Sequence, residues 1–167
     1  NLVGAFYHPK MVLIDPDVLD TLPRHFIADG MGEVIKYGCI KDSRLFDLLC
    51  SYDSFESLRP DLTDVITRCV DIKREVVEAD QYDKGERMLL NFGHTLAHTV
   101  EQHYNYERES HGEAVGIGMY QITKIAEEKG LSDPGCAEKI RKALDIYGLP
   151  CQCGLPLSVL TDAVTLD

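Results

Sequence analysis

Four polar side chains in the middle of the chain share one face of a predicted helix. Their i, i+4, i+7, i+11 spacing places them within about 60° of one another around a continuous helix axis. The stripe comprises Arg87, Asn91, His94 and His98. The apolar face opposite comprises Leu89, Phe92, Leu96 and Val100. A lone histidine is more often an exposed or core-satisfied polar residue. A solvated face would more often carry Glu and Lys, however, so four such side chains in register favour a functional site.

Histidines and a glutamate supply candidate metal ligands. His94 and His98 have the i, i+4 spacing by which one helix presents two imidazoles to zinc, but the glutamate of the H-E-x-x-H motif is absent. His111 precedes a further predicted helix, and Glu33 lies on an earlier one. A catalytic zinc takes three protein ligands and keeps one open position. Glu33 with two of the three histidines would provide them, and the spacing leaves open which two.

Cationic side chains on predicted core faces indicate an anionic ligand. Lys73 lies in the apolar stripe of the helix that starts near Asp61, among Leu62, Val65, Ile66, Cys69, Val76 and Val77. A lysine there either extends along apolar surface to reach water or is held in a pocket for an anion. Lys36 and Arg87 are also set against helical interiors, although an exposed ion pair is the alternative for Lys36 and Glu33. We expect a locally basic site that suits a small carboxylate or phosphate ester.

Capping and turn residues divide the chain into the helices that must position these side chains. Thr21 before Pro23 and Asp61 after Pro60 predict helix starts, and Gly130 predicts a helix end. The predicted helices span about 21–38, 42–52, 61–79, 86–104, 112–129 and 134–147, and another begins near 157. The predicted fold is mainly α.

An apolar run at 11–15, between Pro9 and Pro16, is the one predicted strand. A lone strand cannot satisfy its own backbone groups, so we expect it to complete a sheet outside this chain. The chain begins without Met and ends without an evident cap, and we expect a fragment. Residues 1–20 are then a strand and linker from an N-terminal α/β domain, and 21–167 are a helical domain truncated at its C-terminus.

Composition narrows the class of protein. The chain has 167 residues, 44% hydrophobic and 27% charged, with a formal net charge of −11. This acidity argues against a broad nucleic-acid or anionic-membrane surface, and no apolar run approaches the roughly 20 residues of a membrane span. The six cysteines are scattered, which suits small buried side chains better than a disulfide framework. We therefore expect a globular, cytoplasmic protein.

Five segments, taken in order, carry a resemblance to a known family. They are GAFYHPK at 4–10, LP at 22–23, GMGEVIKYG at 30–38, RMLLNFGHT at 87–95 and HGEAV at 111–115. Together they resemble the 3-dehydroquinate synthases, which are sugar-phosphate cyclases of the shikimate pathway. The resemblance implies an N-terminal NAD-binding α/β domain and a C-terminal helical domain that holds a divalent metal and the substrate. This chain is similar to the second domain.

The resemblance also implies roles for individual residues. The implied ligands of a zinc or cobalt ion are Glu33, His94 and His111. The positions that match substrate-binding or catalytic residues are Lys36, Lys73, Arg87, Asn91 and His98. The positions that match the contact with NAD are Val18, Leu19, Asp20 and Thr21.

The implied reaction converts 3-deoxy-D-arabino-heptulosonate 7-phosphate into 3-dehydroquinate and phosphate, in an enzyme that is commonly a homodimer. The small sugar-acid phosphate is the expected partner. Because this chain lacks a glycine-rich phosphate loop, we expect it to be inactive by itself. Other sugar-phosphate cyclases, such as 2-deoxy-scyllo-inosose or valiolone synthases, are alternatives, as is a non-catalytic helical metal-binding module. Iron-type dehydrogenases are more distant, because they typically have an aspartate at the position of Glu33.

Overall fold

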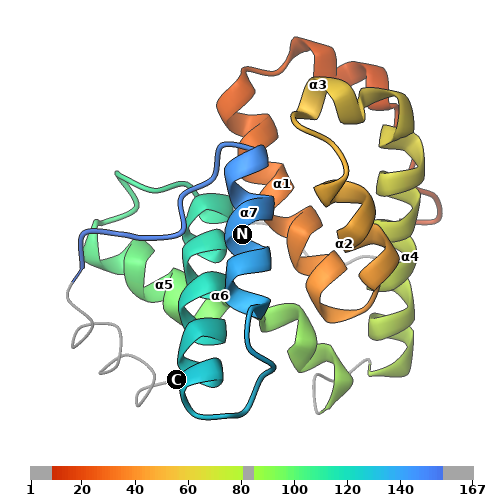
Figure 1. Cartoon of the computed structure of the whole chain (residues 1–167). Coiled ribbons are helices and arrows are strands. Elements are labelled where there is room, and N and C mark those ends of the chain that lie inside the picture. Colours follow the sequence, from red (N-terminus) through yellow and green to blue (C-terminus); the bar gives the residue numbers. More distant parts are fainter. Residues whose placement is uncertain (1–8, 81–84, 156–167) are drawn as a thin grey trace.

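The computed structural model describes residues 9–80 and 85–155, which form a bundle of helices without a β-strand in those ranges (Figure 1). The α-helices are α1 (Arg24–Ile40), α2 (Ser43–Cys50), α3 (Phe55–Leu58), α4 (Leu62–Ala79), α5 (His94–His103), α6 (His111–Glu128) and α7 (Cys136–Ile146). Three 3-10 helices connect them: η1 (Pro16–Thr21), η2 (Arg59–Asp61) and η3 (Glu86–Asn91). The predicted mainly helical fold is confirmed.

Helix α6 is the centre of the bundle, packed against α1, α5 and α7. Small residues allow these close approaches. A Cβ atom placed on Gly118 would lie 2.0 Å from the carbonyl oxygen of Gly93, and one on Gly112 would lie 1.9 Å from that of Asp29. Since real side chains cannot approach so closely, glycine is required at both positions. The backbones of α1 and α5 therefore touch α6 directly, near the residues of the candidate site.

Two predicted helix starts are confirmed by their caps. The Asp42 carboxylate accepts a hydrogen bond from the backbone N–H of Leu45 at the start of α2. Ser110 and Glu113 form a capping box at the start of α6. These caps satisfy N–H groups that have no partner inside a helix.

The first predicted helix start is wrong by three residues. Helix α1 begins at Arg24, and Thr21 belongs to η1, where its hydroxyl donates to the carbonyl oxygen of Val18. Pro23 is the N-cap, with an extended ψ of 145°. Proline has no N–H and disfavours helical geometry in the residue before it, so the helix starts only after Pro23.

The predicted continuous helix over 86–104 is broken at Gly93. The 3-10 helix η3 ends before Phe92, Gly93 has a left-handed φ of 82°, and α5 starts at His94. Arg87 and Asn91 therefore do not share a continuous helical stripe with the histidines. The interruption follows from the contact of Gly93 with α6, which a straight helix through this segment would not make.

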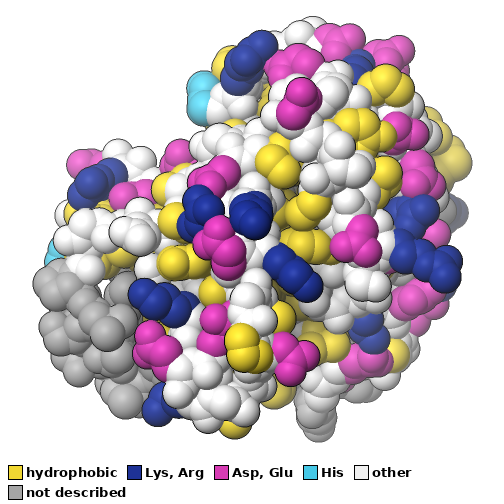
Figure 2. All heavy atoms as spheres, viewed as in Figure 1, with side chains coloured by type: hydrophobic (Ala, Val, Ile, Leu, Met, Phe, Trp, Pro, Cys, Tyr) yellow, Lys and Arg dark blue, Asp and Glu magenta, His cyan; other side chains and the backbone are white. Residues whose placement is uncertain are grey.

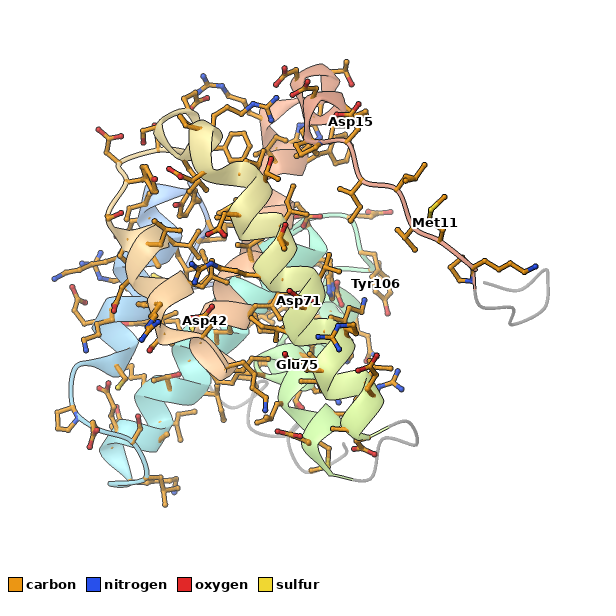
Figure 3. The ribbon with its side chains drawn as sticks, turned by 90° about the vertical axis from the view of Figure 1, so that its right-hand side faces the viewer. Met11, Asp15, Asp42, Asp71, Glu75 and Tyr106 are labelled. Atoms are coloured by element: carbon orange, nitrogen blue, oxygen red, sulfur yellow. The ribbon has the colours of Figure 1, made fainter. Side chains whose placement is uncertain are left out.

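The predicted strand at 11–15 does not form within the described residues. Its apolar side chains are largely exposed, at 70% for Met11 and 83% for Leu13, and Figure 3 shows the segment from Met11 to Asp15 leading away from the bundle. A strand needs hydrogen-bonding neighbours, and no described segment supplies them here. Residues 1–8, which include most of the first motif, and the helix predicted from 157 lie outside the described residues.

The surface carries charges of both signs. On the face shown in Figure 2, basic and acidic side chains are interspersed over α7 and α2, with apolar side chains between them. All six cysteines are free thiols and partly buried, as the sequence predicts. Among the described residues, no helix combines the length and the apolar character needed to cross a membrane.

Candidate metal centre

Three helices bring Glu33, His94 and His111 together. Glu33 lies in the middle of α1, and each histidine is the first residue of its helix, α5 or α6. One ligand atom from each side chain can be chosen so that all three lie within 4.8 Å of one another. The structure thus selects His94 and His111 as the pair facing Glu33, the choice that spacing left open.

The distances in this cluster fit a tetrahedral ion. Glu33 Oε1 lies 3.4 Å from His94 Nε2 and 3.6 Å from His111 Nε2. A zinc ion with bonds of about 2.0–2.1 Å in tetrahedral geometry separates its ligand atoms by about 3.3–3.4 Å. Glu33 Oε1 is also buried without a hydrogen-bond partner. A bound cation would satisfy this oxygen, so the residues present fit a divalent metal.

His94 and Lys36 together keep the glutamate charged. Lys36 is only 3% exposed, and its ammonium lies 2.6 Å from Glu33 Oε2. The exposed ion pair considered from the sequence is therefore wrong for the lysine. Burial disfavours the Glu33 carboxylate, but the neighbouring His94 imidazole and Lys36 ammonium outweigh burial and lower the pKa of Glu33 to about 2. The carboxylate is ionised at neutral pH, as a metal ligand must be.

Each histidine is oriented by a contact at its other ring nitrogen. His111 Nδ1 lies 3.0 Å from Glu101 Oε1, and His94 Nδ1 lies 3.3 Å from the carbonyl oxygen of Phe92. With a metal bound, each Nδ1 would carry the proton and each Nε2 would present its lone pair to the ion, which is the usual arrangement at metal sites. Sequence reasoning missed Glu101. A signal was available, because Glu101 follows His94 by two helical turns and so lies on the same face.

His98 lies beside this cluster and outside it. Its ring makes an edge contact with His94, with the centroids 5.8 Å apart, while the His94 and His111 rings are 5.2 Å apart. His98 is exposed and absent from the group of candidate ligands among the described residues. Its imidazole is therefore exposed next to the candidate ligands.

The predicted position of Lys73 is wrong. The buried stripe of α4 consists of Leu62, Val65, Ile72 and Val76. Lys73 follows the buried Ile72 and is therefore turned by about 100° toward solvent. Apolar residues also occur on the exposed side of α4, such as Val70, which is 46% exposed. The sequence pattern alone therefore does not show which face of α4 is buried.

The other predicted substrate residues lie on η3, which packs against α4. Arg87 is partly buried and Asn91 is exposed. The Asp80 carboxylate accepts hydrogen bonds from the backbone N–H groups of Gly85 and Arg87, at 2.7 and 3.1 Å. Asp80 thus fixes the backbone at the start of η3, from which the Arg87 side chain emerges.

The predicted NAD-contacting segment is η1, which contains Val18, Leu19, Asp20 and Thr21. Arg59 ties it to the bundle. The guanidinium lies 2.6 Å from Asp20 Oδ1, and it donates to the carbonyl oxygen of Pro16 at 3.0 Å. Sequence reasoning did not find Arg59, because no short-range sequence pattern indicates that it contacts a segment some forty positions earlier in the chain.

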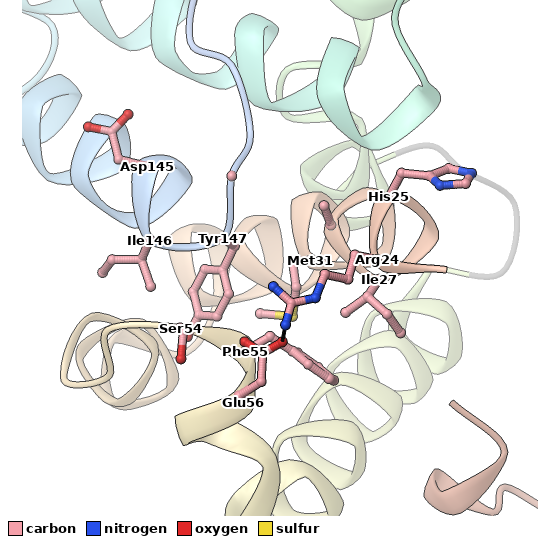
Figure 4. A pocket seen from close by; sticks show the side chains of 12 residues that line it. Arg24, His25, Ile27, Met31, Ser54, Phe55, Glu56, Asp145, Ile146 and Tyr147 are labelled. Carbon is pink, nitrogen blue, oxygen red and sulfur yellow. Dashed lines mark ion pairs between the residues drawn. The ribbon is translucent and has the colours of Figure 1, made fainter. Parts of the chain in front are cut away.

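A separate hollow of about 410 Å³ lies between α1, α3 and the end of α7 (Figure 4). Met31, Phe55 and Tyr147 line it, with the Arg24–Glu56 ion pair of 2.7 Å beside them. None of the three candidate metal ligands borders this hollow. The lining combines apolar side chains with charged side chains that already pair with each other, so it indicates no particular class of ligand.

The fold and the cluster define a helical domain with a candidate metal site of two histidines and one glutamate. The family model described as 3-dehydroquinate synthase C-terminal matches residues 30–167, and the chain belongs to that family. Across its whole length, the chain is 59% identical to the 3-dehydroquinate synthase of Clostridium botulinum (strain Alaska E43 / Type E3), and it covers 48% of that protein. The synthase of Clostridium perfringens (strain 13 / Type A) is 55% identical, with the same coverage.

A solved structure shares the fold. It is 2-epi-5-epi-valiolone synthase from Streptomyces hygroscopicus subsp. jinggangensis 5008, with NAD+ and Zn2+ bound. The TM-score is 0.85 at 26% sequence identity, over 99% of this chain and 47% of the neighbour. The chain therefore spans about half the length of the relatives it matches.

Proposed function

We propose that this chain is the metal- and substrate-binding half of a 3-dehydroquinate synthase, which converts 3-deoxy-D-arabino-heptulosonate 7-phosphate into 3-dehydroquinate and phosphate. The convergence of Glu33, His94 and His111, with a buried glutamate oxygen left unsatisfied, carries the proposal. Identity of 59% to a synthase supports this member of the cyclases over a valiolone synthase, at 26%.

The residues of the centre have separable roles. Glu33, His94 and His111 would hold zinc or cobalt, and the bound ion would stabilise negative charge on substrate oxygens. Lys36 helps to keep Glu33 ionised, and Glu101 holds the His111 ring. Among the described residues, no fourth His, Cys, Asp or Glu joins the three, so one coordination position is available to substrate. An open position favours a catalytic centre over a structural one.

The substrate carries a carboxylate and a phosphate, and the family resemblance matches cationic and polar residues of this chain to substrate-binding positions. We assign the carboxylate to Lys73 and Arg87, because ammonium and guanidinium groups bind anions through charge-assisted hydrogen bonds. Asn91 and His98 are assigned to the phosphate end. The exposure of Lys73 suits a residue that meets the substrate across a cleft formed with another domain.

NAD would supply the hydride acceptor for transient oxidation of the substrate. The described residues contain no strand followed by a glycine-rich turn, so this chain provides only one side of the cofactor cleft, through η1. Arg59 holds η1 on the bundle, which keeps that wall in place. The proposed enzyme therefore needs an N-terminal half, and we propose that it works as a cytoplasmic homodimer.

The test is a chimera that joins this chain to the N-terminal half of the Clostridium botulinum relative. We expect phosphate release from the heptulosonate phosphate in the presence of NAD and zinc, and only background release from the chain alone. A Glu33→Gln chimera should lose at least about 100-fold in kcat/KM. A chimera that binds NAD and zinc yet acts only on a sugar phosphate without a carboxylate would replace this proposal with another cyclase activity.

A further inference from the structure

The start of α6 is pressed against α1 beside the candidate metal centre. The backbone N–H of Gly112, the residue after His111, donates a hydrogen bond to Asp29 Oδ1. Asp29 lies on α1, one turn before Glu33. A Cβ on Gly32 would lie 2.5 Å from the carbonyl oxygen of Gly112. The two helices thus meet backbone to backbone. On α6 the candidate ligand His111 comes just before the contact, and on α1 the candidate ligand Glu33 comes just after it.

The first turn of α6 depends on this contact. Ser110 and Glu113 already cap each other across the turn, but the N–H of Gly112 has no acceptor within its helix. Asp29 supplies one from another helix. Its negative charge also faces the positive end of the α6 dipole, which strengthens the contact.

The side chain of His111 is only partly held by packing. It is 45% exposed. Glu101 fixes the rotation of the ring through Nδ1, but a ring contact leaves the backbone free to shift along α1. The Asp29 hydrogen bond restrains that backbone. Glu101 therefore sets the ring rotation of His111, and Asp29 sets the position of its backbone.

We propose that Asp29 is a positioning residue for the metal centre, which sets the separation between the His111 and Glu33 ligand atoms by holding Gly112 on α1. The proposal rests on the metal site of the proposed function but not on the identity of the substrate. Every readout below is taken from metal binding, so a failure of the synthase assay leaves the test intact.

The experiment compares three variants of the whole chain by zinc affinity, from competition with a chelator, and by the visible absorption of bound cobalt(II). Asp29→Ala removes the acceptor, and Asp29→Asn keeps an oxygen acceptor without the charge. Asp42→Ala is the matched control, because Asp42 also accepts a backbone N–H at a helix start, that of Leu45 on α2, away from the metal.

We expect Asp29→Ala to weaken zinc binding by about 10-fold or more, in the range usual for residues that support ligands, and to alter the cobalt spectrum. Asp29→Asn should stay within about 3-fold of the original chain. Asp42→Ala should lower the melting temperature without changing either metal readout. Unchanged metal binding in Asp29→Ala, or an equal loss in Asp42→Ala, would overturn the proposal.

A folding failure of Asp29→Ala would not end the test. Asp29→Ser retains a hydroxyl acceptor on a shorter side chain, so the helix start can still be capped but from a changed distance. We expect a folded protein with a shifted cobalt spectrum. Its zinc affinity should lie between that of Asp29→Asn and a value about 10-fold below that of the original chain. A spectrum identical to that of the original chain would contradict the positioning role.

Discussion

Lys36 and Glu33 form an ion pair one turn apart on α1 in which the lysine is almost fully buried and only one carboxylate oxygen is used. The ammonium lies 2.6 Å from Oε2, and Oε1 faces His94 and His111. One carboxylate oxygen therefore pairs with the lysine, and the other faces the two histidines of the candidate metal site. The ion pair also leaves the centre less negative than an unpaired glutamate would.

Replacing Lys36 tests this ion pair. Lys36→Met should lower the free energy of unfolding of the metal-free chain by about 2–3 kcal/mol, because a partly buried carboxylate then lacks its partner. Zinc should recover part of that loss, since the metal offers Glu33 another positive charge. Thermal unfolding with and without zinc measures both effects. Lys124→Met is the control, since Lys124 is an exposed lysine on α6. An equal loss of unfolding free energy in this control would show that the buried pair with Glu33 is not the cause.

Replacing Glu101 tests the orientation of His111. Glu101→Ala should weaken zinc binding about 10- to 100-fold, because the His111 ring loses the acceptor at Nδ1. Glu101→Gln should weaken it less, since its amide oxygen can still accept the hydrogen bond. Competition with a chelator measures the affinities. The exposed Glu107 provides the control Glu107→Gln, and a loss of similar size in this variant would point to net charge instead.

Two glycines with left-handed φ angles allow a matched comparison of strain and packing. Gly93 has a φ of 82°, and a Cβ there would lie 2.8 Å from the backbone nitrogen of Met119. Gly130 has a φ of 68° with nothing within 4 Å of its Cβ position. Gly130→Ala should cost about 1–2 kcal/mol from backbone strain, and Gly93→Ala at least about 1–2 kcal/mol more from the clash. Urea unfolding measures the difference, and equal costs would show that α5 can move away from α6.

Arg59 is predicted to hold η1 on the bundle. Arg59→Ala should raise amide hydrogen exchange in 16–21 by about 10-fold or more, because the contacts to Pro16 and Asp20 are lost. Mass spectrometry of the peptide that contains η1 reports the exchange. Arg24→Ala removes an ion pair whose arginine side chain is 88% exposed and should leave η1 unchanged. Exchange that is already fast before substitution would contradict the anchoring role.

The candidate ligands could be predicted from short-range patterns because each is set by local chemistry. His111 stands after a helix-capping serine, and Glu33 precedes Lys36 by one turn on a strongly helical segment. The family resemblance then chose His94 over His98. The convergence of the three candidate ligands depends on how α1, α5 and α6 pack, and glycines at Gly112 and Gly118 permit that close packing.

The errors arose where tertiary contacts override a periodic pattern. The segment 86–104 has helical periodicity, but Gly93 takes a left-handed conformation to meet α6. The sequence predicts a core position for Lys73 because apolar residues occur on more than one face of α4, and only packing decides that Ile72 is buried. Asp29, Arg59 and Glu101 were missed because each acts on a residue distant along the chain or on a neighbouring helix.

The apolar segment at 11–14 has a further consequence, for the handling of the protein. Met11, Val12, Leu13 and Ile14 are each at least 51% exposed in an extended conformation, with β-branched side chains among them. Unpaired backbone next to apolar side chains is a template for strand pairing between molecules, which leads to aggregation. A chain that carries this segment uncovered should associate through it as concentration rises, and a charged residue at Val12 should keep it dispersed.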